Sequence, residues 1–220
     1  DDFNDAFMMH GTTSPFYPII ASMDVAVNMM KGNAGKSLVE ESIDESIEFR
    51  KAVIQIKDEL KKEDESSWFF DVLQPTMVID PETGIEYRFR DAPMALLSQK
   101  ASSWTLKAGE TWHGFKDEDV ADNDFMLDPV KVTITCPGIL PDGTHEKMGI
   151  PGSIVSKFLD DRRTEVARTG DYSLLILFSV GTTKGKWGNL IESLLEFKKH
   201  YDKGSIAADA IPSLKGVSPQ

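Results

Sequence analysis

The sequence predicts an α/β fold, and three stretches support that prediction. Residues 130–136, VKVTITC, alternate apolar and polar side chains, as a half-buried strand does. Residues 171–181, DYSLLILFSVG, form a continuous apolar run that is typical of a central strand covered on both faces. Residues 186–202 carry apolar side chains at helical spacing. Strands and helices therefore alternate along this part of the chain.

Shorter signals complete an α/β unit over residues 65–202. Residues 66–80 are strand-like, and residues 85–89 are expected to pair back across the turn DPETG. Pro151 opens a predicted helix, and TEVART at 164–169 indicates a short strand. The tail from Lys203 is rich in glycine, alanine, proline and serine, and we expect little structure there.

Two predicted helices precede this unit. Ser14 is expected to cap the first, with Pro15 at the first helical position and Pro18 at the fourth, where we expect both prolines to be tolerated. The second is expected to begin at Ser37 after the turn KGNAG. Its apolar stripe is formed by Val39, Ile43, Ile47, Phe49, Val53, Ile54, Ile56 and Leu60. Residues 1–62 have little to pack against by themselves.

Composition excludes several partners. The net charge of −12 argues against nucleic acid and against anionic lipid, both of which need a basic face. No apolar run reaches about 18 residues, so no membrane span is expected. The single cysteine, Cys136, cannot form an internal disulfide, which fits a reducing, cytoplasmic compartment.

Three motifs have a structural interpretation. KGNAGKS at 31–37 lacks the first glycine of a phosphate loop, because Met30 stands there and the preceding segment is helical. Cys136 lies on the apolar face of its predicted strand, which indicates a buried side chain rather than a nucleophile. No metal site is expected, because the histidines lack i, i+4 spacing. They are His10, His113, His145 and His200.

Two segments are candidates for a site. His113 lies in ETWHGF, an aromatic and glycine-containing segment of the kind that folds over a site; the alternative is a structural, hydrogen-bonded histidine. Thr12, Thr13 and Ser14 place three hydroxyl groups before a predicted helix start, where free N–H groups and a partial positive charge suit a phosphate. The alternative there is plain capping by Ser14.

Several collinear stretches between Phe3 and Asp202 resemble the bacterial ornithine/lysine/arginine decarboxylase family. They include FNDAFMMHGTTSPFYPIIASMDVAVNMMKGNAGKSL, WFFDVLQP, TWHGFKDEDVADNDFMLDPVKVTITCPGILPDG, GIPGSIVSKFLDDRR and GDYSLLILFSVGTTKGKWGNLIESLLEFKKHYD. The resemblance implies an enzyme of fold type I that uses pyridoxal 5'-phosphate (PLP).

The resemblance also implies a domain organisation. Residues 1–62 would be the tail of an aspartate aminotransferase-like, PLP-binding large domain with its linking helices. Residues 65–202 would be a small C-terminal α/β domain with a mainly antiparallel sheet and flanking helices, and residues 203–220 would begin a further, truncated region. The Ser-x-His-Lys motif that carries the cofactor lysine in the family does not occur here. We therefore expect that lysine upstream in a longer polypeptide, and we expect this segment alone to be inactive.

One cofactor contact follows from the resemblance. In the family, the first threonine of the TTSP segment reaches the PLP phosphate of the neighbouring subunit, and the matching residue is Thr12. Thr13 and Ser14 lie beside it and are candidates for the same phosphate.

Substrate choice is the harder inference. Lysine- and ornithine-specific relatives carry a glutamate where this chain has Ala167, and Glu165 is a candidate replacement on the same face. His113 is a further substrate candidate. Residues 78–97 and 184–188 resemble segments of acid-inducible arginine decarboxylases. Arginine is therefore the predicted substrate, with lysine or ornithine as the alternative.

The resemblance implies conversion of L-arginine to agmatine and CO2, which consumes a proton and links the family to acid resistance and polyamines. It implies homodimers, with active sites at the interface, that assemble into decamers of five dimers. Protonation of an acidic chain would favour such association. Hypotheses of another class are a non-catalytic fragment that acts only as an assembly module, and a regulatory homologue that has lost PLP.

Overall fold

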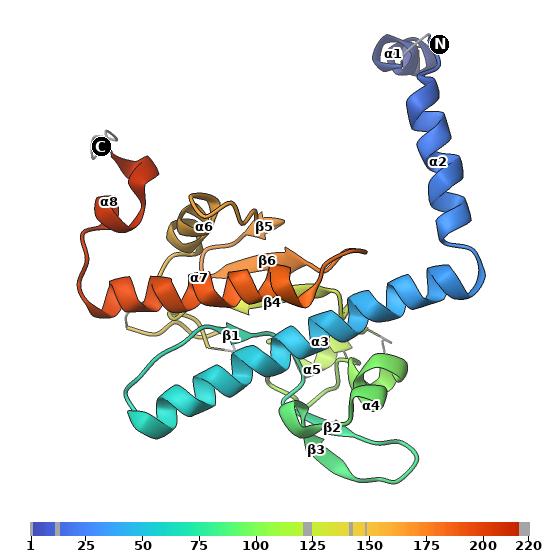
Figure 1. Cartoon of the computed structure of the whole chain (residues 1–220). Helices are drawn as coiled ribbons and strands as arrows, with labels where there is room; N and C mark the ends of the chain where they lie inside the picture. The colour runs from blue at the N-terminus through green and yellow to red at the C-terminus, as the bar shows by residue number, and fades with distance from the viewer. Residues whose placement is uncertain (1, 12–13, 121–124, 141–142, 148, 216–220) are drawn as a thin grey trace. The chain divides into compact units, whose positions relative to one another are not determined.

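The computed structural model describes residues 2–11, 14–120, 125–140, 143–147 and 149–215 (Figure 1). The chain divides into two compact units, Asp1–Glu40 and Glu41–Gln220. The first unit ends inside a long helix, α3 (Gly32–Glu63), so the units share one continuous element. The division into family domains at residues 62 and 203 stays a prediction.

The first unit is helical. It consists of α1 (Asp2–His10), α2 (Tyr17–Met29) and the beginning of α3, and no residue of α1 or α2 is buried. The sequence predicted α2 but not α1. The predicted start of α3 at Ser37 is wrong, because the helix begins at Gly32.

Two glycines explain the early start of α3. Gly32 adopts a positive φ of 60°, which changes the direction of the chain directly after the end of α2. A Cβ atom at Gly35 would collide with the backbone of Met30. Met30, the residue that directly follows α2, therefore lies against the first turn of α3. The predicted turn KGNAG is therefore mostly helix, and only Met30 and Lys31 connect the two helices.

The second unit is built on a four-stranded sheet in the order β1 (Asp71–Val72), β4 (Lys131–Thr135), β6 (Ser173–Leu177), β5 (Arg168–Thr169). All three pairings are antiparallel. This confirms the predicted α/β class and the antiparallel sheet. The finer assignment to fold type I stays a prediction.

Three helices contribute to one core with this sheet: the C-terminal part of α3, α6 (Gly152–Asp160) and α7 (Lys184–Asp202). The alternation of β4 is confirmed, because Val132 and Ile134 are fully buried while Lys131 is exposed. The predicted helices after Pro151 and over 186–202 are confirmed. Fully buried residues of this core are Phe49, Val53, Phe70, Val132, Ile134, Val155, Phe158, Leu159, Leu174 and Leu194.

Strand β6 corrects one prediction. Leu174 is fully buried against the helices, but Leu177 remains 50% exposed. Leu177 pairs with exposed Lys131 of β4, so these two residues lie on the face of the sheet opposite Leu174. The expected cover on both faces of this strand is therefore wrong within the described residues, because the three helices share the core of the other face.

A second, smaller core lies beside the sheet. Strands β2 (Met77–Ile79) and β3 (Glu86–Arg88) form the antiparallel hairpin that the sequence predicted. The short helices η1 (Phe89–Asp91), α4 (Met94–Gln99) and η2 (Ala101–Ser103) follow it. Their apolar side chains gather around Trp104 and around Ile47 of α3. α3 therefore contributes to both cores.

The C-terminal tail is more structured than predicted. It contains α8 (Ala207–Ala210) and η3 (Pro212–Leu214), and Ala210 and Ile211 are buried in the main core. The N–H of Ser213 donates to Asp161 at 3.0 Å. A further short helix, α5 (Asp117–Val120), lies in the loop before β4. Among the helices described, none is both long enough and apolar enough to cross a membrane.

Candidate functional site

The hydroxyl cluster lies in the connection between α1 and α2. Thr12 and Thr13 fall outside the described residues, so their predicted phosphate contacts stay predictions. The predicted capping role of Ser14 is wrong: the N-cap of α2 is Phe16, which is extended at φ −94° and ψ 92° and makes no side-chain cap.

Pro18 explains the later start of α2. If Ser14 were the cap, Pro18 would stand at the fourth helical position, whose N–H normally makes the first bond to the cap carbonyl. The observed start places Pro18 at the second position, where no N–H is needed. The same arrangement weakens the anion-binding prediction, because Pro18 has no N–H and the N–H of Ile19 already donates to the Phe16 carbonyl at 3.0 Å. Residues 18 and 19 therefore have no N–H group available to a phosphate at this helix start.

His113 is held by the backbone of its own loop. Its Nε2 lies 3.0 Å from the Lys107 carbonyl oxygen, and the N–H of Phe115 donates to Nδ1 at 3.1 Å. Because a carbonyl only accepts and an N–H only donates, these partners fix the neutral tautomer that carries its proton on Nε2. His113 is buried, and both ring nitrogens are engaged, as the structural alternative predicted. Its contact with substrate stays a prediction.

Glu165 and Ala167 line one depression of about 440 Å³. Residues of α6 form its other wall, among them Ser156, Lys157 and Asp160. Both site residues are exposed, and within the described part of the chain the Glu165 carboxylate makes no hydrogen bond or ion pair. Ala167 is fixed by its N–H, which donates to the Leu175 carbonyl at 2.8 Å. A free carboxylate two residues from Ala167 is thus available to a cation.

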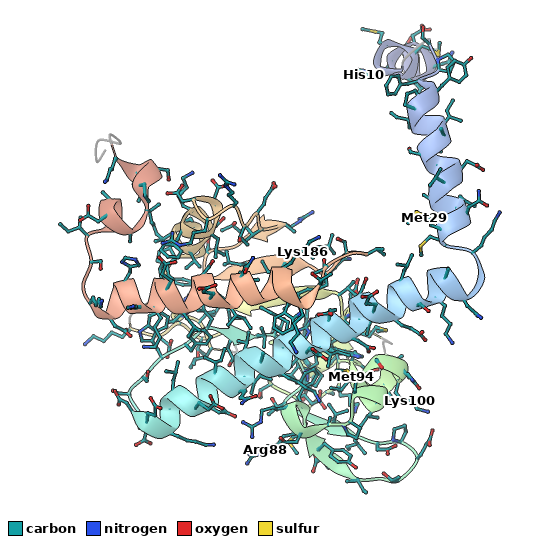
Figure 2. The ribbon with its side chains drawn as sticks, viewed as in Figure 1. His10, Met29, Arg88, Met94, Lys100 and Lys186 are labelled. Atoms are coloured by element: carbon teal, nitrogen blue, oxygen red, sulfur yellow. The ribbon has the colours of Figure 1, made fainter. Side chains whose placement is uncertain are left out.

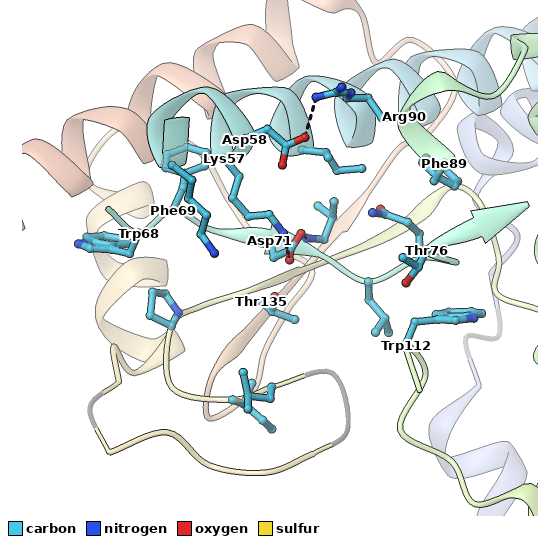
Figure 3. Close-up of a pocket in the computed structure, with 18 of the residues that line it drawn as sticks. Lys57, Asp58, Trp68, Phe69, Asp71, Thr76, Phe89, Arg90, Trp112 and Thr135 are labelled. Carbon is cyan, nitrogen blue, oxygen red and sulfur yellow. Dashed lines mark hydrogen bonds and ion pairs between the residues drawn. The ribbon is translucent and has the colours of Figure 1, made fainter. Parts of the chain in front are cut away.

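A larger cavity of about 800 Å³ lies between α3, the extended segment 65–77 and the loop that follows β4 (Figure 3). Lys57 forms an ion pair with Asp71, and Arg90 forms one with Asp58 at 2.6 Å. The lining also holds Lys61, Arg88, Glu65 and Glu146, so cationic and anionic side chains are equal in number and show no preference for a ligand of one charge. The sequence did not point to this cavity, since it is formed by side chains that are distant along the chain.

Cys136 also lines this cavity, and its thiol is buried. Burial raises the pKa of its thiol to about 12, so almost no thiolate is present near neutral pH. This agrees with the structural interpretation of the sequence. Among the described residues, no three His, Cys, Asp or Glu side chains are grouped as metal ligands.

Arg50 is the important residue that the sequence analysis missed. It is fully buried in α3, and its guanidinium donates to the carbonyls of Leu73, Pro129 and Lys131 at 2.7–3.1 Å. Burial lowers the pKa of this guanidinium to about 9, which leaves it charged at neutral pH. The available signal was its spacing, because Arg50 stands three residues after Ile47 in the apolar stripe.

The predicted residues in the second unit do not form one site. His113 closes a loop whose neighbour Trp112 lines the larger cavity, whereas Glu165 and Ala167 line the depression beside α6. The hydroxyl cluster belongs to the first unit.

Comparison with known proteins identifies close relatives. The family described as "Orn/Lys/Arg decarboxylase, major domain" matches residues 1–186. The biodegradative arginine decarboxylase of Escherichia coli is 46% identical over 212 residues, which are 96% of this chain and 28% of that protein. A lysine decarboxylase of Pseudomonas aeruginosa is 43% identical over 212 residues, which are 96% of this chain and 26% of that protein.

The fold agrees with this similarity. The solved structure of lysine decarboxylase A from Pseudomonas aeruginosa matches with a TM-score of 0.75 and 41% identity, over 98% of this chain and 26% of that one. The chain thus spans about a quarter of the length of the relatives it matches.

Proposed function

We propose, because the chain belongs to the Orn/Lys/Arg decarboxylase family, that these 220 residues form part of a longer enzyme that decarboxylates a basic amino acid. The observation that carries the proposal is the family match over residues 1–186. The relatives are about four times as long as this chain, which leaves room for the residues that it lacks. We propose a cytoplasmic location, because the single cysteine of these 220 residues fits a reducing compartment.

The proposed cofactor is PLP. When bound, PLP supplies the electron sink that makes loss of CO2 feasible. The hydroxyl groups of Thr12, Thr13 and Ser14 are neutral donors that fit its phosphate, with Thr12 as the principal contact, made across a dimer interface. The lysine that holds the cofactor belongs to the remaining polypeptide, because no Ser-x-His-Lys motif occurs in this sequence.

The phosphate contact is tested in the full-length enzyme by Thr12→Val, which keeps the shape of the side chain and removes its hydroxyl. PLP retention after dialysis is expected to fall about tenfold, since one charge-assisted hydrogen bond contributes roughly 1.5 kcal/mol. Thr182→Val, in the second unit, is the matched control and should retain the cofactor. Unchanged retention in Thr12→Val would contradict the proposal.

Arginine is the proposed substrate. Ala167 lacks the carboxylate that would receive a compact ammonium, and Glu165 offers a carboxylate two residues away in the same depression. The similarity to relatives supports lysine equally, because 46% and 43% identity do not separate the two activities.

Steady-state kinetics on arginine, lysine and ornithine test this choice. We expect kcat/KM to be highest for arginine, and we expect Glu165→Gln to lower it more than Glu192→Gln on α7. A strong preference for lysine would reject arginine and would identify Glu165 as the replacement carboxylate.

The proposed partner is a second copy of the chain, with dimers assembling into a decamer. The net charge of −12 opposes association near neutral pH, and protonation toward the pI of about 4.8 reduces that repulsion. Sedimentation of the full-length protein should therefore show larger assemblies at pH 5.5 than at pH 8. The same size at both pH values would contradict this link between charge and assembly.

A non-catalytic assembly module is the second candidate, and the missing Ser-x-His-Lys motif favours it. The mass of the natural gene product and the visible absorption of bound PLP distinguish the two. A product near 24.5 kDa without that absorption would leave only the assembly function.

A further inference from the structure

Helix α2 is apolar around about three-quarters of its circumference at 100° per residue, apart from Ser22, whose hydroxyl donates to the Ile19 carbonyl at 2.7 Å. Ile19, Ile20, Met23, Val27 and Met29 are spread over this arc, and each is more than half exposed. Figure 2 shows side chains leaving α2 on opposite sides of its axis, with Met29 at its last turn. A helix that is apolar over so wide an arc is normally enclosed by protein.

The remaining quarter is a polar seam. Asp24, Asn28 and Lys31 follow one another at i, i+4 and i+7, and hydrogen bonds join them. The Asn28 side-chain amide donates to the Asp24 carbonyl at 3.0 Å, and Lys31 Nζ donates to Asn28 Oδ1 at 2.9 Å. Asp24 is the only charged residue within α2. Because its groups are polar, this seam is the side of α2 best suited to remain in contact with water.

We propose that the remaining polypeptide of the same subunit encloses α2 on every side except the Asp24–Asn28–Lys31 seam. The inference rests on the proposed function, in which this chain is part of a longer enzyme. Relatives about four times as long supply the polypeptide needed for such an enclosure. A second copy is the less suitable cover, because a two-fold interface contacts one side of a helix rather than an arc of this width.

Thiol labelling of the full-length protein tests the enclosure. Val27→Cys reports on the apolar arc and Asp24→Cys on the seam, both in a full-length background in which Cys136 and every other reactive cysteine are replaced by alanine. We expect maleimide to label Val27→Cys at least 100-fold more slowly than Asp24→Cys, at every protein concentration. The isolated 220-residue segment, used only as a comparison, should label both positions at similar rates.

Three results would overturn the inference. Equal labelling of both cysteines in the full-length protein would show that α2 is not enclosed. Protection that disappears on dilution would assign the cover to a second copy. Protection already present in the 220-residue segment would place the cover within these residues.

The unsubstituted protein provides a second measurement if a cysteine variant does not fold. Met23 and Met29 lie on opposite parts of the arc, so peroxide should oxidise both slowly in the full-length protein and quickly in the segment. Fast oxidation of both in the full-length protein would also overturn the enclosure. Bound PLP and decarboxylation are measured on the same samples, so protection without activity rejects the proposed function alone, and activity without protection rejects only the enclosure.

Discussion

Helix α2 and the C-terminal half of α3 show opposite relations between composition and burial. α2 has one charged residue, and none of its residues is buried in its unit. α3 is rich in charge, yet Ile47, Phe49 and Val53 are fully buried, and so is the cation of Arg50. The difference lies in the width of the apolar surface. A sheet and its neighbouring elements cover a stripe, whereas an apolar surface that surrounds a helix needs protein on several sides.

The strongest test of the difference between the two helices is a substitution of Arg50. Arg50→Met leaves three buried carbonyls without their donor, so we expect the free energy of unfolding to fall by about 3–5 kcal/mol. Urea denaturation measures the change. Lys62→Met, an exposed position on the same helix, is the control and should change stability by less than about 0.5 kcal/mol. A small effect at Arg50 would mean that water replaces the guanidinium.

A matched pair of isoleucines compares the two helices directly. Ile47→Ala removes a fully buried side chain that α3 contributes to the small core and should destabilise the chain by about 2–4 kcal/mol. Ile20→Ala, at a half-exposed position of α2, should change stability by less than about 0.5 kcal/mol in the 220-residue segment. Equal losses measured by thermal unfolding would show that α2 is already covered there.

His113 offers a test of intermediate size. His113→Phe keeps a ring but loses both hydrogen bonds to the loop, so stability should fall by about 1–2 kcal/mol. If the residue is structural, kcat of the full-length enzyme on arginine should remain within about twofold. A large fall in kcat at unchanged stability would instead support the predicted substrate contact.

The smallest expected effect concerns the ion pair between Arg162, in the turn that follows α6, and Glu196 of α7. Arg162 donates to both carboxylate oxygens of Glu196, at 2.7 and 2.8 Å, and this hydrogen bonding lowers the pKa of Glu196 from 4.5. The pair therefore stabilises the fold above pH 4.5, and this contribution is lost as pH falls through the lowered value. The pair is partly exposed, so Glu196→Gln should reduce stability by at most about 1 kcal/mol.

Denaturation of the Glu196→Gln variant at pH 7, 5 and 3 gives the measurement. The difference from the unsubstituted chain should be constant down to about pH 5 and should shrink below it. A difference that grows on acidification would contradict the assigned direction of the pKa shift.

The sequence by itself determined the elements whose signals are local. The alternation of β4, the hairpin across Asp80–Gly84 and the stripe of α3 each depend on neighbours within a few residues. Each is present, except that the stripe begins at Ile43, because Val39 is exposed. Collinear motifs also predicted the family, and the family match over residues 1–186 confirms that prediction. Local signals gave the wrong start for α2, because Ser14 predicted an N-cap there. The position of Pro18 instead favours a start at Tyr17, with Phe16 as the N-cap.

Only the tertiary structure decided which surfaces are covered. Arg50 contacts carbonyls 23 to 81 residues away, and no periodicity reports such a contact. The apolar run of β6 predicted burial on both faces of the strand, but it could not show that Leu177 remains half-exposed. Likewise, Glu165 and Ala167 share a depression only because α6 packs beside their segment. Burial depends on the free energy of bringing distant segments together, and that information is spread over the whole chain.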